Sequence, residues 1–283
     1  MLAKPDWLHV RSGNLANMDA VEGILSRLGL NTVCREACCP NYQECFSRKT
    51  ATFMIMGTNC TRNCRFCDVR YDLPQQLDPE EPRRVAQAVK ELELKYVVVT
   101  SVTRDDLSDG GAEHFAKVIA EIKHAAPETA IEVLIPDFKG SIDALKVVTD
   151  AFPNVISHNM ETVKSLYSVV RPQARYNCSL ELLRNIKLLD SRIHSKSGIM
   201  VGLGETKDEV YKLFDDLLEV GCEFLTIGQY LSPSKQHLSV QEYIEPSQFE
   251  EYGLVARKKG FKFVASAPLV RSSFNAGEAL MTF

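Results

Sequence analysis

The chain has 283 residues, of which 45% are hydrophobic and 25% charged, and its formal net charge is -4. These values are ordinary for a globular protein, and the weak acidic charge argues against nucleic-acid binding, which usually needs a basic face. No apolar run approaches the roughly 18 residues of a membrane-spanning helix. Residues Met1–Val10 also lack the apolar stretch of a secretory signal. We therefore expect a cytoplasmic protein without a nucleic-acid or membrane partner.

The first fifty residues carry a group of cysteines after a short amphipathic helix, which we expect at 21–28. If Cys38 is left out, the spacing of Cys34, Cys39 and Cys45 is C-x4-C-x5-C. A shifted set that uses Cys38 in place of Cys39 is the alternative. The chain has nine cysteines, and in a reducing compartment such clusters favour metal binding or catalysis over disulfides.

A second cysteine group follows the first predicted strand, at 52–56. Cys60, Cys64 and Cys67 are spaced C-x3-C-x2-C, and close thiolates suit soft metals and four-iron clusters. A closed cluster needs four protein ligands, whereas this loop offers three, which leaves one iron open to an external ligand. A zinc site, or a cluster completed by a distant fourth cysteine, is the alternative.

The middle of the chain alternates between apolar runs and helical periodicity. After the strand at 52–56, we expect strands at 96–100, 131–135, 155–156, 197–201 and 224–227, each separated from the next by helical segments. A further strand is expected at 261–265. Such alternation predicts parallel βα units. Six units indicate a partial barrel, although a doubly wound open sheet has the same periodicity.

Polar residues follow the predicted strands, where the chemistry of parallel α/β proteins collects. Asn159 and Glu161 are candidates for binding a polar ligand, and Arg171 could pair with a carboxylate because a guanidinium binds it bidentately. Glycines allow close backbone approach to a ligand. The glycine candidates at these strand ends are Gly110, Gly111, Gly202 and Gly204.

The Cys60–Cys67 octet resembles the radical S-adenosylmethionine (SAM) superfamily. That resemblance implies a four-iron, four-sulfur (4Fe–4S) cluster whose open iron binds the amino and carboxylate groups of SAM. It also implies that Phe66 lies by the adenine, that Gly110 and Gly111 contact the SAM amino group, and that Gly202 and Gly204 lie near the adenosine. Asn159 and Glu161 become candidates for the ribose hydroxyls or the methionyl group.

The two cysteine groups together resemble the lipoyl synthase family, as do Pro40-Asn41, Ala51-Thr52-Phe53-Met54-Ile55 and Phe66-Cys67-Asp68-Val69. The resemblance covers residues 20–277 and favours a partial (β/α)6 TIM-type barrel over 51–231. Extensions at 1–50 and 232–283 would carry a second, auxiliary 4Fe–4S cluster held by Cys34, Cys39 and Cys45. Cys38 departs from the family pattern, which has no cysteine there.

The tail motif Arg271-Ser272-Ser273-Phe274 resembles the Arg-Ser-Ser-Tyr of the same family. That likeness implies Ser273 as the fourth ligand of the auxiliary cluster, and Phe274 replaces the usual tyrosine. A hard serine oxygen serves an iron–sulfur centre less well than thiolate, which suits a cluster that is dismantled as the sulfur donor.

The implied activity is that of a sulfurtransferase that inserts sulfur at C6 and C8 of a protein-bound octanoyl chain. The implied partners are an octanoylated lipoyl carrier domain (glycine cleavage H protein or 2-oxoacid dehydrogenase E2) and an electron donor such as ferredoxin or flavodoxin. A biotin-synthase-like enzyme and a two-cluster electron carrier without catalysis are the alternatives. A carrier would need four cysteines per cluster and a smaller fold.

Overall fold

The computed structural model describes residues 3–8, 14–48, 51–274 and 276–281, so part of the Met1–Val10 segment lies outside the described residues. At its centre is one sheet of eight strands in the order β1-β2-β3-β4-β5-β6-β7-β8. The strands are β1 (Asn31–Thr32), β2 (Thr52–Ile55), β3 (Tyr96–Ser101), β4 (Ala130–Leu134), β5 (Val155–Ser157), β6 (His194–Val201), β7 (Phe224–Gln229) and β8 (Phe263–Ser266). All seven predicted strands are present.

The sheet is parallel from β2 to β8. Only β1 is antiparallel, pairing Asn31 with Met54 and Thr32 with Phe53. Two residues are too few to show an alternating pattern, so β1 could not be predicted. The strands β2 to β7 form the six expected units, and β8 extends the sheet. The partial barrel is therefore confirmed, with one strand added at each edge.

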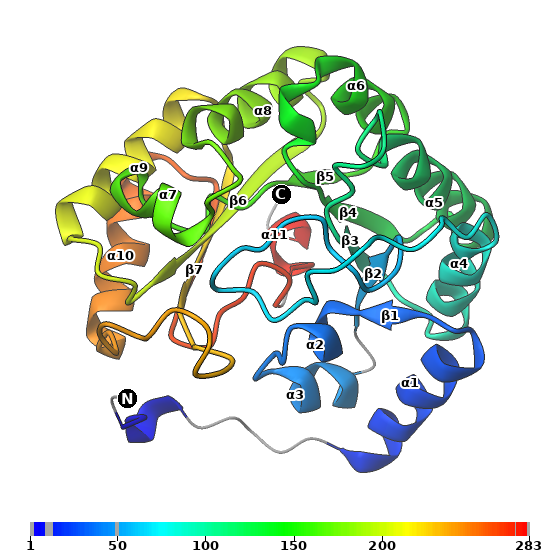
Figure 1. Ribbon diagram of the computed structural model, residues 1–283, viewed down its shortest axis with the longest axis horizontal. Coiled ribbons are helices and arrows are strands. Elements are labelled where there is room, and N and C mark those ends of the chain that lie inside the picture. Colours follow the sequence, from blue (N-terminus) through cyan, green and yellow to red (C-terminus); the bar gives the residue numbers. More distant parts are fainter. Residues whose placement is uncertain (1–2, 9–13, 49–50, 275, 282–283) are drawn as a thin grey trace.

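Helices surround the strands on the outside, as Figure 1 shows. They are α1 (Leu15–Arg27), α4 (Glu81–Glu91), α5 (Ala112–Ala125), α6 (Ile142–Asp150), α8 (Tyr176–Leu189), α9 (Lys207–Glu219) and α10 (Pro246–Lys259). Each buries the apolar face that its helical periodicity predicts; α5, for example, buries Phe115, Val118, Ile119 and Ile122. Such a face stabilises the barrel by roughly 25 cal/mol for each Å² of apolar surface removed from water.

Several helical boundaries differ from the sequence prediction. Helix α1 begins earlier than residue 21 because Asn14 caps it, its side-chain oxygen accepting a hydrogen bond from the Asn17 amide. The first helical segment between β5 and β6 is divided into a 3-10 turn, η3 (Lys164–Leu166), and the short α7 (Tyr167–Val170). Short pieces at α2 (Val33–Glu36) and α3 (Tyr42–Ser47) hold the first cysteine group.

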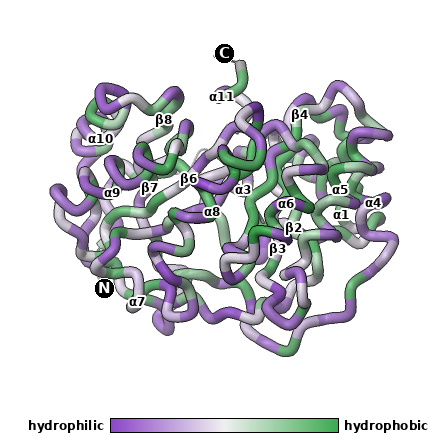
Figure 2. The backbone as a smooth tube through the Cα atoms, turned by 90° about the horizontal axis from the view of Figure 1, so that it is seen from above, coloured by the Kyte–Doolittle hydropathy of each residue, from purple (hydrophilic) through white to green (hydrophobic). Residues whose placement is uncertain are grey.

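The C-terminal segment covers one end of the barrel. Ala279 of α11 (Glu278–Met281) packs with Val155 and Phe224, the first residues of β5 and β7. In Figure 2, α11 lies at one edge of the molecule and α7 at the opposite edge. The tail therefore covers the amino ends of the strands and leaves their carboxyl ends to the loops. Within the described ranges, no helix is long and apolar enough to cross a membrane.

The sheet includes strands from outside the 51–231 segment, because β1 comes from the first fifty residues and β8 from the last fifty. The division into 1–50, 51–231 and 232–283 stays a prediction.

Candidate active site

The second cysteine group lies in the loop that joins β2 to α4, at the carboxyl end of β2. The Cys60 amide donates to the Arg70 carbonyl at 2.8 Å, and the Cys60 sulfur accepts from the amides of Arg62 and Thr103 at 3.4 and 3.3 Å. The Cys67 amide donates to the Cys64 carbonyl at 3.1 Å. Backbone hydrogen bonds thus fold the three cysteines into one compact loop.

Arg62 fixes this loop to the sheet. It is 5% exposed and binds two carboxylates, each through two hydrogen bonds. Its Nε and Nη2 donate to Asp105 at 2.7 and 3.0 Å, and its Nη1 and Nη2 donate to Asp137 at 2.8 and 2.6 Å. Asp105 follows β3 and Asp137 follows β4, so one guanidinium holds the cysteine loop to two strand ends.

The thiols of this loop lie close enough to affect one another. Burial, together with the neighbouring Cys64 and Cys60, raises the pKa of Cys67 to about 12. Burial also raises the pKa of Cys64, whereas the charge of Arg171 opposes that rise. Thiols bind iron as thiolates and must release their protons, so the raised pKa values of Cys64 and Cys67 should make metal loading easier at higher pH.

The expected SAM-binding side chains meet beside this loop. Asn159 Nδ2 donates to Glu161 Oε1 at 3.0 Å, and Arg171 Nη1 donates to the Asn159 carbonyl at 2.8 Å. Glu161 has φ of 66°, and its backbone exchanges hydrogen bonds with Gly198 and Met200 of β6. Burial raises the pKa of Glu161, and Arg171 opposes the shift. The structure therefore brings Asn159, Glu161 and Arg171 into one polar group.

Two buried atoms in this group have no hydrogen-bond partner within the described residues: Asn159 Oδ1 and Arg171 Nε. Arg171 also forms no ion pair with a carboxylate in that part of the chain, so its guanidinium is available to the carboxylate of a ligand. Leaving a buried polar atom unpaired costs about 1–3 kcal/mol. A ligand with amino, hydroxyl and carboxylate groups, such as SAM, fits these atoms.

A hydrogen-bond chain supports Arg171 from behind. His158 Nδ1 donates to the Ile135 carbonyl at 2.8 Å, and its Nε2 accepts from Ser179 Oγ at 2.9 Å. The Tyr167 hydroxyl donates to Ser179 Oγ at 2.7 Å and accepts from Arg171 Nη1 at 2.7 Å. In this chain His158 Nε2 must accept the hydrogen bond from Ser179, which is possible only when the imidazole is neutral. The protonation state of His158 is therefore coupled to the position of Arg171.

We expect His158 to make stability depend on pH. Burial, with the charge of Arg171, lowers the pKa of His158 from 6.5 to about 4. The unfolded chain therefore binds the proton first, and stability falls by about 3 kcal/mol as pH drops from 6.5 to 4. His158→Gln should lose this dependence, as urea unfolding at pH 7 and 5 would show. If the free energy of unfolding changed equally with pH in the unchanged chain and in His158→Gln, the prediction would be wrong. Any effect of pH on the cysteine groups is the same in both proteins and cancels in this comparison.

The glycines that we predicted to contact SAM are closely packed against other residues of the chain. An added methyl at Gly110 or Gly111 would lie 2.8 Å from the Phe138 ring or 2.3 Å from the Met56 sulfur. At Gly202 it would lie 2.2 Å from Gln229 Nε2, and the Gly202 amide donates to the Glu205 carboxylate. These glycines, and Gly204 with φ of 111°, shape the rim. SAM contacts by any of them stay a prediction.

Two further residues lie beside the Asn159–Arg171 group and the cysteine loop. Gly198 of β6, which sequence analysis missed, lets Asn159 approach, because a methyl there would lie 2.9 Å from Asn159 Oδ1. Phe66 is partly buried against an apolar cluster that contains Val170, Leu203 and Tyr230. Phe66 therefore lies where the loop meets the carboxyl ends of β6 and β7.

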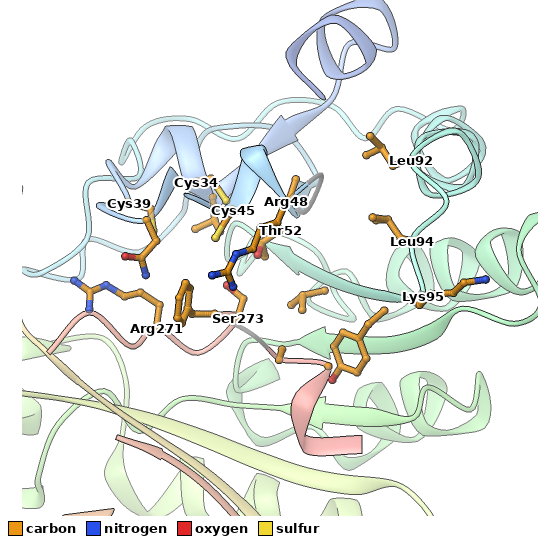
Figure 3. Close-up of a pocket in the computed structure, with 18 of the residues that line it drawn as sticks. Cys34, Cys39, Cys45, Arg48, Thr52, Leu92, Leu94, Lys95, Arg271 and Ser273 are labelled. Carbon is orange, nitrogen blue, oxygen red and sulfur yellow. The ribbon is translucent and has the colours of Figure 1, made fainter. Parts of the chain in front are cut away.

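The first cysteine group lines a cavity of about 510 Å³. Cys34, Cys39 and Cys45 form one wall, and Arg271 and Ser273 of the tail lie across from them, as Figure 3 shows. The Asn41 side chain joins the two walls, its Nδ2 donating to the Leu269 carbonyl at 2.7 Å. The structure thus brings Ser273 to the cysteines from which it is far removed in sequence.

The thiols of this second group also affect one another. Burial raises the pKa of Cys34 to about 11 and that of Cys45 to about 12, with neighbouring thiols adding to both shifts. Burial raises the pKa of Cys39 too, whereas the Asn41 amide and the Arg271 charge oppose it. Arg271 interacts electrostatically with both Cys39 and Glu161, so it lies between the cysteine cavity and the Asn159–Arg171 group.

Cys38 is placed differently from its neighbour Cys39. Its side chain is exposed, its φ is 46°, and its sulfur donates to Asp68 Oδ2 at 3.0 Å. Cys38 is not among the residues that line the cavity. The set Cys34, Cys39 and Cys45 therefore fits an auxiliary cluster better than the shifted set.

Each cysteine set offers three thiolates, the ligand type that holds iron–sulfur clusters. In the described ranges, no three His, Cys, Asp or Glu side chains are grouped around a single-ion position. In a 4Fe–4S cluster each thiolate binds a different iron, so the assignment rests on the cysteine sets, the cavity and the mutual effects of the thiols. Cys178 and Cys222 are buried elsewhere.

Comparison with known proteins agrees with this geometry. Residues 54–217 match the Radical SAM superfamily. Lipoyl synthase from Alkaliphilus metalliredigens is 56% identical over 98% of this chain and 96% of its own length. Lipoyl synthase from Caldicellulosiruptor saccharolyticus is 58% identical over 97% of this chain and 96% of its own length. The chain belongs to the lipoyl synthase family.

Solved structures support the fold of this lipoyl synthase family member. SuiB of Streptococcus suis bound to S-adenosylmethionine aligns with a TM-score of 0.59 at 10% identity, over 87% of this chain and 60% of that chain. Methylornithine synthase aligns with a TM-score of 0.52 at 14% identity, over 90% and 80%. At these identities the likeness concerns the barrel alone.

Sequence analysis missed the residues that hold the candidate ligand-binding residues in position. Arg62 stands inside the cysteine octet, but its partners are 43 and 75 positions away. His158, Ser179 and Tyr167 show no spacing that indicates a network. Arg271 belongs to a recognised motif, yet its place between the two sites follows only from the fold. No signal in a single sequence could have identified these roles.

Proposed function

We propose that this chain is a lipoyl synthase that inserts sulfur at C6 and C8 of an octanoyl chain attached to a carrier-protein lysine. One observation carries the proposal: a second three-cysteine group shares a cavity with Ser273, in a barrel that already has a cysteine loop at its strand ends. Three thiolates at the strand ends suffice to hold a SAM-binding cluster, so the second group indicates a further step, and the lipoyl synthase relatives favour sulfur insertion as that step.

We assign Cys60, Cys64 and Cys67 to the cluster that binds SAM. When bound, that cluster and SAM supply an electron and a 5′-deoxyadenosyl radical, which can remove hydrogen from an unactivated carbon. The chain orients SAM through Asn159, Glu161 and Arg171, with Phe66 at the adenine. These side chains are largely buried, which excludes water from the reacting carbon.

We assign Cys34, Cys39, Cys45 and Ser273 to the auxiliary cluster, which is consumed as the sulfur donor. The cavity of about 510 Å³ that these residues line leaves room for a cluster. Ser273 would supply a hard oxygen ligand, which an iron–sulfur centre holds less firmly than thiolate, and would therefore suit a cluster that is dismantled. Arg271, next to Cys39, offsets the negative charge of the thiolates.

The partners follow from this chemistry. The substrate is an octanoylated lipoyl carrier domain, either the glycine cleavage H protein or a 2-oxoacid dehydrogenase E2, and a ferredoxin or flavodoxin supplies electrons. The thiols need a reducing compartment, for which we propose the cytoplasm.

Anaerobic reconstitution, iron counting and an octanoyl-peptide assay with SAM and dithionite would test the proposal. We expect about eight irons per chain, as two four-iron clusters require, with 5′-deoxyadenosine and a dithiolated peptide as products. About four irons, with SAM cleavage but no thiolation, would contradict the assignment of the first cysteine group and Ser273.

A further inference from the structure

A polar groove of about 510 Å³ lies on the outer side of the SAM-cluster loop. It is lined by Asn63, Arg65, Tyr71, Pro172, Gln173, Gln236 and His237. We call it the loop groove. Along the loop, Asn63 and Arg65 are exposed, whereas Cys64, Phe66 and Cys67 are half-buried. The loop therefore turns its cysteines inward and the loop groove outward.

The floor of the loop groove is bonded directly to the cysteine loop. His237 Nε2 donates to the carbonyl of Cys67 at 3.0 Å, and the Asn63 amide donates to Gln173 Oε1 at 2.6 Å. The Leu238 amide also donates to the Arg65 carbonyl at 3.1 Å. One imidazole thus links the solvent-exposed surface to the backbone of a cluster ligand.

The charge of the loop groove is positive. No carboxylate lines it, although Asp68 lies 3.7 Å from His237 Nε2. Arg65 lies in the groove and Lys235 beside it; both are exposed, and neither forms a side-chain hydrogen bond or ion pair with another described residue. Arg70, nearby in sequence, is neutralised by Asp72. Tyr71 adds an exposed aromatic ring, 58% accessible.

We propose that the loop groove is the docking site of a small acidic electron-carrier protein that reduces the SAM cluster. The inference rests on the proposed function and names the surface that its electron donor uses. The donor would lose one electron, and the iron–sulfur centre that Cys60, Cys64 and Cys67 would hold would gain it. No covalent bond forms or breaks in the transfer.

The geometry favours an electron carrier over the octanoylated carrier domain as the occupant. An octanoyl chain has to reach the interior, where Asn159 and the Cys34–Cys45 cavity lie. His237 and Leu238 hold the loop backbone between the loop groove and the cysteines through hydrogen bonds, and an acyl chain would have to break those bonds to pass. An electron needs only a short separation and good contact, which His237 provides.

Charge reversal would test the loop groove. For Arg65→Glu, we expect the rate of SAM cleavage driven by reduced flavodoxin to fall about tenfold at low salt, because steering by opposite charges sets such rates. The difference should shrink at high salt. Dithionite, a small reductant, should support equal cleavage in both proteins. Calorimetric titration with oxidised flavodoxin should show about tenfold weaker binding.

Lys235→Glu provides a second variant outside the cysteine loop, in case Arg65→Glu fails to load iron, and the same losses are expected. Lys117→Glu is the matched control, since it makes the same charge change on the exposed face of α5. None of these assays needs an octanoyl substrate, so failed thiolation would count against the proposed function alone.

Two results would overturn the proposal. In the first, Arg65→Glu and Lys235→Glu bind and accept electrons from both flavodoxin and ferredoxin as well as Lys117→Glu does. In the second, the variants weaken binding of the octanoylated carrier domain while reduction by the donor proteins stays unchanged, which would make the loop groove a substrate-docking surface instead.

Discussion

Cys39→Ala is expected to abolish lipoyl product while reductive cleavage of SAM continues. Cys39 lies in the cavity with Cys34 and Cys45, whereas Cys60, Cys64 and Cys67 belong to a separate loop at the carboxyl end of β2. Loss of one thiolate from the cavity should therefore remove the sulfur donor and spare the SAM cluster. The measurements are iron content, 5′-deoxyadenosine and thiolated octanoyl peptide in the same sample.

Cys38→Ala offers an unusually close control. Cys38 is the adjacent residue, but its thiol is exposed and bonded to Asp68 rather than directed into the cavity. We expect this variant to keep full iron and full product. Ser273→Ala should give an intermediate result, with the cluster bound but lost more readily. Product from Cys39→Ala, or loss of product from Cys38→Ala alone, would show that the shifted cysteine set holds the cluster.

Arg62→Ala is expected to destabilise the fold by about 3–5 kcal/mol and to empty the SAM-cluster loop of iron. Removing one partner of a buried ion pair leaves an uncompensated charge, and that is the usual cost. Here two carboxylates, Asp105 and Asp137, would both lose their cation. Denaturant unfolding would measure the stability, and iron counting with SAM cleavage would measure the loop.

We call the arrangement in which Arg62 binds both Asp105 and Asp137 the Arg62 clamp. Two comparisons separate the effect of this geometry from the effect of the positive charge alone. Arg62→Lys keeps the charge but cannot bind two carboxylates bidentately, so it should still lose most of the iron. Arg192→Ala removes an exposed arginine that also binds a carboxylate, Asp190, and should change stability far less. If Arg62→Ala and Arg192→Ala were equally stable and equally loaded with iron, the clamp would have no such role.

The same clamp should make the protein sensitive to strong acid. Burial alone would raise the pKa of Asp137, but its hydrogen bonds and charge interaction with Arg62 outweigh burial and lower it from 3.8 to about 2. The pKa is lowered in the folded state, so this stabilisation is present above pH 4 and is lost as pH falls towards 2.

Features that depend on a short stretch of sequence could be predicted, whereas features that depend on contacts between distant segments could not. β-branched runs such as Tyr96–Thr100 identified the strands, because burial in a parallel sheet demands them. The cysteine spacings identified both candidate sites. The contrast between Cys38 and Cys39 could not be predicted, because it depends on a positive φ at Cys38 and on Asp68 in another loop.

The glycines illustrate the opposite difficulty. Gly110, Gly111 and Gly202 suggested a cradle for a ligand, yet their surroundings show that close packing against Phe138, Met56 and Gln229 already requires them. A sequence reports that a side chain is missing, but not which neighbour needs the space. Neighbours of that kind are set by the whole fold, so only coordinates identify them.

The walls of the auxiliary cavity come from chain segments more than 200 positions apart. A ribosome therefore makes Cys34 long before Ser273, and the strands of the barrel can form between the two events. During that interval the three early thiols have neither their serine partner nor the cover of the tail. A cluster bound in that interval would be lost more readily, so we expect stable assembly of the auxiliary cluster only when translation is nearly finished. A nascent chain stalled before residue 271 would leave the three thiols uncovered by the tail.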